Sequence, residues 1–450
     1  MWFAISLMAL SRMWLMNKSL VKNSIFNISY RGYNVVYPVI TSAYISRIFL
    51  ADGVGEIAFA INIVTYFTLA ASLGIPNYAI KVLSPLINDK IALNRKFSEL
   101  ATFIFFSSMV ATLLYYMVVM WLYGQTVSSV RFQMGVIMGL MVVTNIFNYD
   151  WLFESMEDFR YLAYRSITIK TIALLLMFLT VKTRDDILIY CLIYAGITAA
   201  NNIWNFASAR RYVCYSYRQL DIHCHLSPVF TLFAAAFATE VYTLLDSTML
   251  GIMCPPENLG YYSNASRLVR ASFGLVFASI AVFNPRLNYL YKSGNREDYN
   301  RLFQKFYDMG MYIAFPAAAA LFVSAPWVMT ILFGDDFIPG IVTLRLLSCL
   351  IIIFTLAMVF GHIGLIIYGK EKVLLLAAVV GAIINFSLNT LLIPAYQHQG
   401  AAMASIVSEC LITLLLISVS LKCCRIQLLN KRLVVLAVSC LAICTGCVLI

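Results

Sequence analysis

The stretch KVLLLAAVVGAIINFSLNTLLIP spans residues 372–394 and has a charged side chain only at its first position. A helix needs about 20 predominantly apolar residues to cross the hydrocarbon core of a bilayer. This stretch is long and apolar enough to do so, and comparable stretches recur along the whole chain. The recurrence predicts a polytopic membrane protein built of helices.

Twelve such stretches can be read from the amino end of the sequence. They are residues 24–48, 55–76, 98–123, 132–153, 160–181, 186–207, 227–252, 262–285, 309–333, 341–368, 372–394 and 399–421. A thirteenth apolar run, residues 433–450, could span the membrane or lie as an appendage. The connections are short and polar, and none is long enough to form an extramembrane domain.

The composition excludes two broad classes of protein. Hydrophobic residues make up 62% of the 450 residues and charged residues 12%, whereas a soluble domain has roughly 45–50% and 25%. The net charge of +11 does not indicate nucleic-acid binding, because no polar domain exists on which the basic residues could cluster. The positions of the basic residues relative to the spans must therefore explain the charge.

Lysine and arginine are concentrated in alternate connections. One set of connections holds 21 of them, and the other set holds only Arg131, Lys182 and Arg184. Cytoplasmic loops carry such an excess, so the amino terminus and all the basic connections are predicted to face the cytoplasm. The 21 residues are Lys18, Lys22, Lys81, Lys90, Arg95, Lys96, Arg160, Arg210, Arg211, Arg218, Arg286, Lys292, Arg296, Arg301, Lys305, Lys370, Lys372, Lys422, Arg425, Lys431 and Arg432.

Small residues recur about half a chain apart. Gly55 and Gly260 are separated by 205 positions, and Gly196 and Gly400 by 204. This spacing is close to half the length of residues 16–421 and favours two six-helix halves. Together with the apolar stretches it predicts an all-α polytopic membrane protein of about 12 transmembrane helices, or 13, in two pseudo-symmetric six-helix lobes, which in transporters surround a central cavity. The predicted organisation is an N-terminal extension at residues 1–15 with a more natural start at Met16, an N-lobe at 16–210, a cytoplasmic inter-lobe loop at 211–226, a C-lobe at 227–421, and a basic segment with an extra helix at 422–450.

Twelve charged residues lie within or beside the predicted spans. Because a charge near the bilayer centre costs at least about 2.5–3.5 kcal/mol, such residues normally face a partner or a wet cavity. The basic ones are Arg31, Arg47, Arg165, Lys170, Arg267, Arg270 and Arg345, and the acidic ones are Asp150, Glu154, Glu240, Asp246 and Glu409.

Helical spacing gathers several of these residues on polar stripes. Tyr37, Tyr44 and Arg47 continue one stripe on the first span, while Tyr242 and Asp246 share a face of the seventh. Arg267 and Arg270 lie one turn apart on the eighth span, where mutual repulsion favours an anionic guest. The alternatives are that the stripes satisfy one another in helix packing, or that Arg31, Arg47 and Arg165 snorkel to the interfaces.

Other polar residues of the spans have less specific interpretations. Asn385 and Asn389, four residues apart in the eleventh span, are more typical of helix packing than of ligand binding. Ser405 and Glu409 in the twelfth span could serve either purpose. The tripeptide His223-Cys224-His225 is interpreted as a solvated loop rather than a metal site, because no second ligand cluster accompanies it.

At this point several segments resemble the multidrug/oligosaccharidyl-lipid/polysaccharide exporter superfamily, in its O-antigen (polysaccharide) flippase branch. The resemblance covers roughly residues 16–421. It is carried by Tyr44-Ile-Ser-Arg47, Leu73-Gly-Ile-Pro-Asn-Tyr78, Asn148-Tyr-Asp-Trp-Leu-Phe153, Tyr242 to Gly251, Leu259-Gly-Tyr-Tyr262, Asn284-Pro-Arg286, Gly334-Asp-Asp-Phe337, Asn385 to Pro394 and Gly400-Ala-Ala402.

The resemblance implies a flippase of the bacterial inner membrane rather than an enzyme. Its substrate would be an undecaprenyl-diphosphate-linked oligosaccharide, moved from the cytoplasmic to the periplasmic leaflet by alternating access. Transport would be coupled to an H+ or Na+ gradient, with membrane lipids and the O-antigen polymerase machinery as partners. No cofactor, metal or nucleic acid is expected.

Roles for individual residues follow from the stripes and the resemblance together. The predicted substrate-binding cavity contains Arg31, Arg47, Tyr37, Tyr44, Tyr242, Arg267 and Arg270. The predicted ion- or proton-coupling residues are Asp246, Glu240 and Glu409.

Two other functions remain open at this point. A drug exporter of the same superfamily should have an acidic cavity, whereas the spans here carry seven basic and five acidic residues. A membrane-embedded O-antigen polymerase or sugar transferase should have a long exterior loop or clustered catalytic residues, and the longest outward connections have about ten residues.

Overall fold

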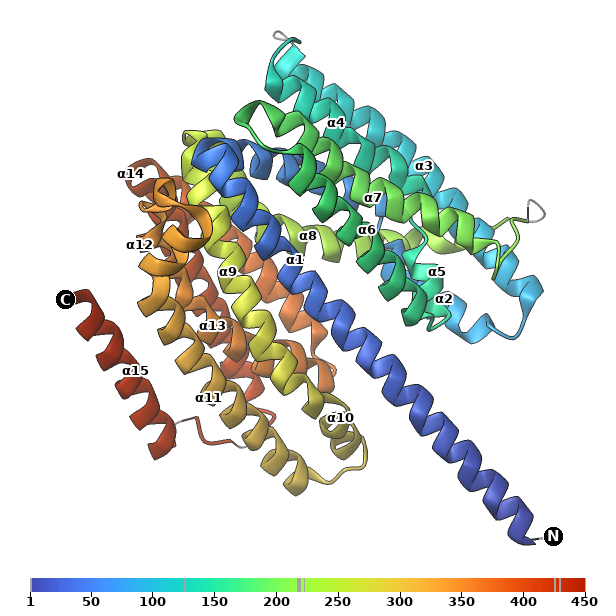
Figure 1. Cartoon of the computed structure of the whole chain (residues 1–450). Coiled ribbons are helices and arrows are strands. Elements are labelled where there is room, and N and C mark those ends of the chain that lie inside the picture. Colours follow the sequence, from blue (N-terminus) through green and yellow to red (C-terminus); the bar gives the residue numbers. More distant parts are fainter. Residues whose placement is uncertain are drawn as a thin grey trace. The chain divides into compact units, whose positions relative to one another are not determined.

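The chain folds into helices, and no strand occurs among the residues that the computed structural model describes (Figure 1). The described residues are 2–124, 127–216, 220–221, 223–424, 426–428 and 430–449. For residues 2–31, 35, 235, 282, 448 and 449 the description covers the backbone and not the side chain.

The helices follow one another in the order expected from the apolar stretches. The first half contains α1 (Trp2–Ser72), α2 (Ile75–Leu83), η1 (Ser84–Leu86), α3 (Lys90–Tyr123), α4 (Val130–Thr144), η3 (Asn145–Phe147), α5 (Asp150–Ser155), α6 (Phe159–Thr180), η4 (Arg184–Asp186) and α7 (Ile187–Ala209). The second half contains α8 (His223–Met253), α9 (Pro256–Ile280), η5 (Ala281–Phe283), α10 (Asn284–Lys292), α11 (Arg296–Val328), η6 (Met329–Phe333), η7 (Asp335–Phe337), α12 (Gly340–Ser348), α13 (Leu350–Ala357), η8 (Met358–Leu365), α14 (Glu371–Ser420) and α15 (Lys431–Leu449).

Nine helical segments of the described chain are long and apolar enough to cross a membrane, or ten when the bent pair α9 and α10 counts as one span. Two of the nine each hold two predicted spans, because the backbone bends inside a continuous helix. The bends lie at Leu50 in α1, with φ 57°, and at Gln397 in α14, with φ 50°. Short bends therefore replace the predicted connections 49–54 and 395–398, and the all-α polytopic membrane fold is confirmed.

Two units divide the chain. Unit 1 contains Met1–Pro38 and Val64–Ala236, and unit 2 contains Val39–Ile63 and Phe237–Ile450. Helices α1 and α8 contribute residues to both units, and the first change of unit falls at the proline inside α1. The predicted lobes place residues 39–63 in the N-lobe instead, and those lobe boundaries remain predictions.

A buried ion pair lies in the core of unit 1. Arg165 of α6 is only 2% exposed, and its guanidinium lies 2.8 Å from Oδ1 of Asp150 at the start of α5. Its other N–H groups donate to Asn201, at 2.9 Å, and to Asn205, both on α7. Neighbours on α5 and α7 satisfy the guanidinium of Arg165 inside the unit, which agrees with the alternative that the polar residues of the spans satisfy one another in helix packing.

Replacing Arg165 with Met should destabilise the protein by about 2–3 kcal/mol, somewhat less than the roughly 3–5 kcal/mol for breaking a fully buried pair. The reduction is expected because the Asp150 side chain is 45% exposed and keeps access to solvent. Thermal unfolding of the purified protein measures the change. Arg301→Met is the control, because Arg301 pairs with Glu297 at the surface; equal losses in both variants would contradict the structural role of Arg165.

The start of α6 is fixed by Asp158. Its Oδ1 accepts from the backbone N–H of Tyr161, at 3.2 Å, and its Oδ2 accepts from the hydroxyl of Tyr212, at 2.7 Å. Burial and the neighbouring carboxylate raise the pKa of Tyr212 to about 12. The phenol therefore keeps its proton at neutral pH and continues to donate, which ties the segment after α7 to α6.

In unit 2 the α1 segment Val39–Ile63 packs closely on α9. A Cβ added to Gly55 would lie 1.8 Å from the carbonyl oxygen of Pro256, and one added to Gly260 would lie 2.1 Å from that of Ala51. One turn further along α9, buried Asn264 accepts from Ser42 and donates to Ser46, both at 2.7 Å. Small residues thus allow two backbones to touch, as is common between membrane helices.

The bend of α1 is held by two contacts within unit 2. The backbone N–H of Ala51, directly after Leu50, donates to Oδ2 of Asp336 at 2.7 Å. Arg47, one turn before the bend, donates to the carbonyl oxygen of Ile331 in the π-helical segment η6. The sequence motifs at residues 44–47 and 334–337 therefore meet at this bend.

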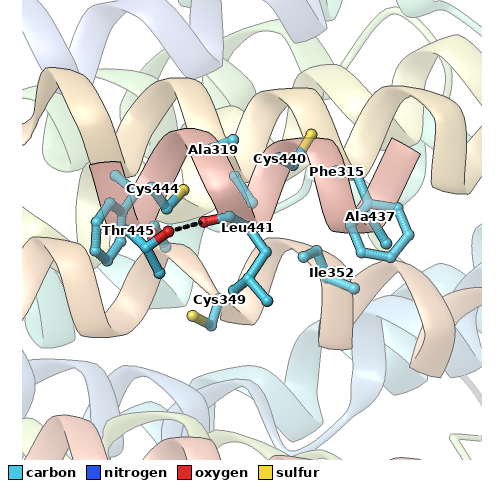
Figure 2. A pocket seen from close by; sticks show the side chains of 12 residues that line it. Phe315, Ala319, Cys349, Ile352, Ala437, Cys440, Leu441, Cys444 and Thr445 are labelled. Atoms are coloured by element: carbon cyan, nitrogen blue, oxygen red, sulfur yellow. Dashed lines mark hydrogen bonds between the residues drawn. The ribbon is translucent and has the colours of Figure 1, made fainter. Parts of the chain in front are cut away.

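Helix α15 packs against α11 and leaves a pocket of about 510 Å³ beside it. Figure 2 shows Phe315 and Ala319 of α11 facing Cys440 and Cys444 of α15, with Cys349 from the α12–α13 junction nearby. All of the lining side chains are apolar, thiol or hydroxyl groups. This pocket is consequently unsuited to bind a charged group.

Candidate functional site

A buried carboxylate with four donors is the most developed polar site of unit 2. Asp246 of α8 is 8% exposed. Its Oδ1 accepts from the side-chain amides of Asn385 and Asn389, at 2.9 and 2.7 Å. Its Oδ2 accepts from the hydroxyl of Tyr262, at 2.7 Å, and from that of Ser405. These five residues are called the Asp246 cluster below.

The cluster brings together residues that the sequence left separate. Asn385 and Asn389 precede the bend of α14 at Gln397, and Ser405 follows it. Tyr262 comes from α9 and belongs to the Leu259-Gly-Tyr-Tyr262 motif. The interpretation of the two asparagines as helix-packing residues agrees with these bonds, which join α14 to α8 and also hold a predicted coupling residue.

The chemistry of the Asp246 cluster suits a proton or a hard cation. All four donors to Asp246 are neutral, and among the described residues no Lys, Arg or His forms an ion pair with it. The amide oxygen of Asn389 is buried and accepts no hydrogen bond from the described atoms. A carboxylate beside an available amide oxygen offers the oxygen ligands that hard cations prefer.

A second carboxylate lies beside this cluster. Glu409 of α14 accepts a hydrogen bond of 2.6 Å from the hydroxyl of Tyr242 on α8. It also interacts electrostatically with Asp246 and with Arg270. The structure therefore brings together Asp246, Glu409 and Tyr242, three of the predicted site residues, whereas Glu240 is half-buried and is not among the described contacts of the cluster.

The two predicted arginines of α9 have different surroundings. Arg267 is half-buried, and Arg270 is exposed. Arg270 donates to the carbonyl oxygen of Thr243, at 3.3 Å, and to the hydroxyl of Ser266, at 3.4 Å. No described carboxylate lies within ion-pair distance of its guanidinium, so an anionic group can still bind it.

The predicted residues of the first span are divided between the units. Tyr37 belongs to unit 1, and Tyr44 and Arg47 belong to unit 2. Tyr37 and Tyr44 are half-buried, and Arg47 is exposed at the α1 bend. The side chain of Arg31 lies outside the described residues.

Lys170 of α6 is an in-span cation of unit 1 with neutral partners. Its ammonium donates to the amide oxygen of Asn34 and lies 5.5 Å from the centre of the Tyr37 ring. No described carboxylate pairs with it. Its position inside an apolar span is the signal that could have identified it as a site residue.

Sequence reasoning also missed Glu99, which lies on α3 inside a predicted span. Glu99 is fully buried, and its carboxylate lies 2.6 Å from Nζ of Lys96 and 2.7 Å from Nε2 of His225. Arg95 pairs with it at 3.1 Å, and the spacing of three and four residues from Lys96 and Arg95 is the signal that could have revealed it. Nδ1 of His225 bonds to the hydroxyl of Tyr78 at 2.8 Å.

The interpretation of residues 223–225 as a solvated loop is thus wrong for His225, which is 2% exposed near the start of α8. Glu99, Cys224 and His225 are close enough to hold a metal ion. However, Nζ of Lys96 contacts all three, at 2.6 Å from Glu99, 3.4 Å from His225 and 3.7 Å from Cys224. The ammonium takes the position that a metal would need, and the cluster fastens α8 to α3.

Comparison with a family model decides the family. Residues 20–290 match the model described as polysaccharide biosynthesis protein, which is more than half of the chain. The chain belongs to the polysaccharide biosynthesis protein family. The match includes residues 20–38 and 64–236 of unit 1, Asp246 and both arginines of α9.

Two curated relatives agree with membership of this family. A protein of Escherichia coli (strain K12), whose name describes it as a candidate O-antigen transporter, is 23% identical over 410 residues. The alignment covers 89% of this chain and 96% of that protein. A Shigella dysenteriae protein with the same name is 24% identical over 272 residues, which cover 59% of this chain and 67% of the relative.

Solved structures share the fold. The lipid II flippase MurJ, in an inward closed conformation, has a TM-score of 0.71 and 14% identity, covering 95% of this chain and 92% of MurJ. An inward-facing multidrug transporter of the MATE family has a TM-score of 0.66 and 10% identity, covering 92% of this chain and 98% of that one. The predicted helical fold is therefore confirmed by these structures, and the polysaccharide biosynthesis family by the family model.

Proposed function

We propose that this protein is a flippase that moves undecaprenyl-diphosphate-linked O-antigen repeat units from the cytoplasmic to the periplasmic leaflet. Family membership supports a role in polysaccharide biosynthesis, and the names of the relatives support transport of O-antigen. Alternating access coupled to an H+ or Na+ gradient drives the movement. The protein resides in the bacterial inner membrane with its amino terminus in the cytoplasm, and the O-antigen polymerase machinery receives the translocated units.

The observation that carries this proposal is the arginine pair of α9. Arg270 lies within a predicted span and is exposed, with hydrogen bonds only to neutral groups among its described contacts. A guanidinium donates paired N–H groups that match a phosphate. A diphosphate linked to a lipid supplies that anion, whereas a cationic drug would be repelled. We assign Arg267 and Arg270 to diphosphate binding.

The Asp246 cluster supplies the coupling. A carboxylate inside a span is stable when it is protonated, bound to a cation or fully hydrogen-bonded. Asp246 is at present held by neutral donors from α9 and from both parts of α14. Binding of H+ or Na+ would change which donors it holds, and thereby the packing of those helices. Glu409 and Tyr242 act beside it.

Replacing Arg270 with Ala should lower O-antigen display by about tenfold, equivalent to the loss of about 1.4 kcal/mol of binding or barrier lowering. The measurement is display on cells of a strain that lacks the wild-type gene and expresses the variant. Undecaprenyl-linked single repeat units should accumulate facing the cytoplasm, and Arg270→Lys should restore part of the activity.

Arg286→Ala is the matched control, because Arg286 lies on α10 over the ring of Tyr289 and outside the arginine pair. It should retain display close to wild type. Undiminished display in Arg270→Ala, at a normal protein level, would refute the assigned role. Unpolymerised repeat units facing the periplasm would instead indicate a polymerase.

A further inference from the structure

A second pocket lies in unit 2, away from the Asp246 cluster and the arginines of α9. Its volume is about 460 Å³, within the range of pockets that bind small molecules. Four segments form it: the end of α10, the start of α11, the segment after η8 and the end of α14. Its lining residues are Tyr291, Arg296, Asn300, Tyr368, Lys370, Leu421, Lys422, Cys423 and Cys424.

All of the charged lining residues are basic. Arg296, Lys370 and Lys422 come from three different segments of the chain and converge on one cavity. No ion pair between these three and a described carboxylate exists. The acidic residues at the start of α11 already have partners, since Glu297 pairs with Arg301 and Asp298 accepts from Asn295. Three like charges around one cavity repel one another unless an anion lies between them.

The pocket is pre-formed. The guanidinium of Arg296 lies 4.3 Å from the centre of the Tyr291 ring, which holds the cation against the wall. Tyr291 and buried Tyr299 both pack edge-on against Tyr368 in the core of this unit. A rigid aromatic wall therefore positions one cation and limits the entropy lost on binding.

Residues that follow Lys422 in the chain are also fixed. The backbone N–H of Gln427 donates to Oε1 of Gln304 at 2.8 Å, and the Gln304 amide donates back to the Gln427 carbonyl at 3.0 Å. The hydroxyl of Tyr307 donates to the carbonyl of Leu428 at 2.7 Å. These bonds hold Gln427 and Leu428, which follow the pocket residues in the chain, on α11.

We propose that this pocket binds a phosphate-bearing ligand at the end of unit 2 that is predicted to face the cytoplasm. Arg296 provides paired N–H donors, while Lys370 and Lys422 provide point charges. The phosphate comes from an anionic phospholipid headgroup of the adjacent leaflet or from a water-soluble phosphate compound. Basic pockets at the cytoplasmic side of helix bundles bind such headgroups.

The test uses the full-length protein in a neutral detergent, with two probes. Native mass spectrometry measures retained phosphatidylglycerol against phosphatidylcholine, and thermal unfolding measures stabilisation by inorganic diphosphate. The double variant Lys370→Gln/Lys422→Gln should lower the affinity for the bound probe by about tenfold. A neutral glutamine amide binds a phosphate more weakly than a lysine ammonium, because hydrogen bonds from a charged donor are the stronger ones. The control is Lys292→Gln/Lys305→Gln, which removes the same charge from the same end of unit 2 but outside the pocket lining.

Loss of phosphatidylglycerol binding in the double variant alone assigns the pocket to a lipid headgroup. Loss of stabilisation by diphosphate alone assigns it to a soluble phosphate. Equal binding in wild type, double variant and control overturns the proposal. A second measurement needs no variant: the bound probe should slow maleimide labelling of Cys423, which lines the pocket, and an unchanged rate with both probes also overturns it.

Discussion

Replacing Asp246 with Asn should reduce O-antigen display by about 100-fold, equivalent to about 2.7 kcal/mol, with the protein still present in the membrane. The substitution removes the negative charge that the proposed ion coupling needs. It also replaces one carboxylate oxygen with an NH2 group. The two groups that donate to that oxygen, either the two asparagines or Tyr262 and Ser405, then lose their acceptor. Display on complemented cells and the protein level by immunoblot measure the two effects separately.

Asp336→Asn is the matched control for this prediction. Asp336 is an exposed carboxylate of the same unit that accepts from the backbone N–H of Ala51, and an Asn oxygen can accept in its place. Display should stay within about twofold of wild type, a difference below 0.5 kcal/mol. Wild-type display in Asp246→Asn would end the assignment of Asp246 to coupling, whatever the control does.

The coupling ion can be assigned from the same variant. If the ion is Na+, NaCl should raise the unfolding temperature of the wild type above that in KCl, because a ligand of the folded state stabilises it. The increase should vanish in Asp246→Asn. An equal unfolding temperature in the two salts would favour H+ as the ion.

Gly55→Ala should prevent most of the protein from folding, with the yield of monodisperse protein falling about fivefold or more. The added Cβ would lie 1.8 Å from the carbonyl oxygen of Pro256, so the backbones of α1 and α9 must separate. Overpacking a core costs about 1–3 kcal/mol when neighbouring side chains can shift. The loss of stability should be larger here, because the group in the way is the backbone carbonyl of Pro256, which cannot move without moving the helix. Size-exclusion chromatography after extraction measures the yield.

Gly196→Ala provides the matched control on α7. A Cβ at Gly196 meets no atom within 4 Å, so the change should be neutral or stabilising by up to about 1 kcal/mol through helix propensity. Gly260→Ala should behave like Gly55→Ala, because its Cβ would lie 2.1 Å from the carbonyl of Ala51. Normal yields from both contact variants would show that the two helices separate easily.

The fold could be predicted almost entirely from apolar length, because a span of about 20 apolar residues leaves little choice of structure. The two bends could not. Leu50 and Gln397 adopt positive φ without being glycine, and neither belongs to a residue type that usually marks such a turn. The Asp336 side chain that caps the first bend is far away in sequence.

The candidate site was predictable only residue by residue. Their position within a span alone identified Asp246, Glu409 and Arg270. A charge in an apolar span is costly unless it faces a partner or a water-filled cavity. Their partners could not be deduced, because hydrogen bonds such as that from Asn389 to Asp246 join residues 143 positions apart. Helical periodicity gives the face of one helix but not its neighbour, so the asparagines could not be recognised as members of the site.

The four donors around Asp246 have a stoichiometric consequence. A carboxylate has about four lone-pair sites, and the donors of the cluster fill all of them. An incoming metal ion would therefore have to displace one of these donors, whereas an added proton requires only that the Ser405 hydroxyl turn to donate to the Ala401 carbonyl, 2.9 Å away. Either change would alter a contact that joins Asp246 of α8 to α9 or α14, which is how the proposed coupling would reach those helices.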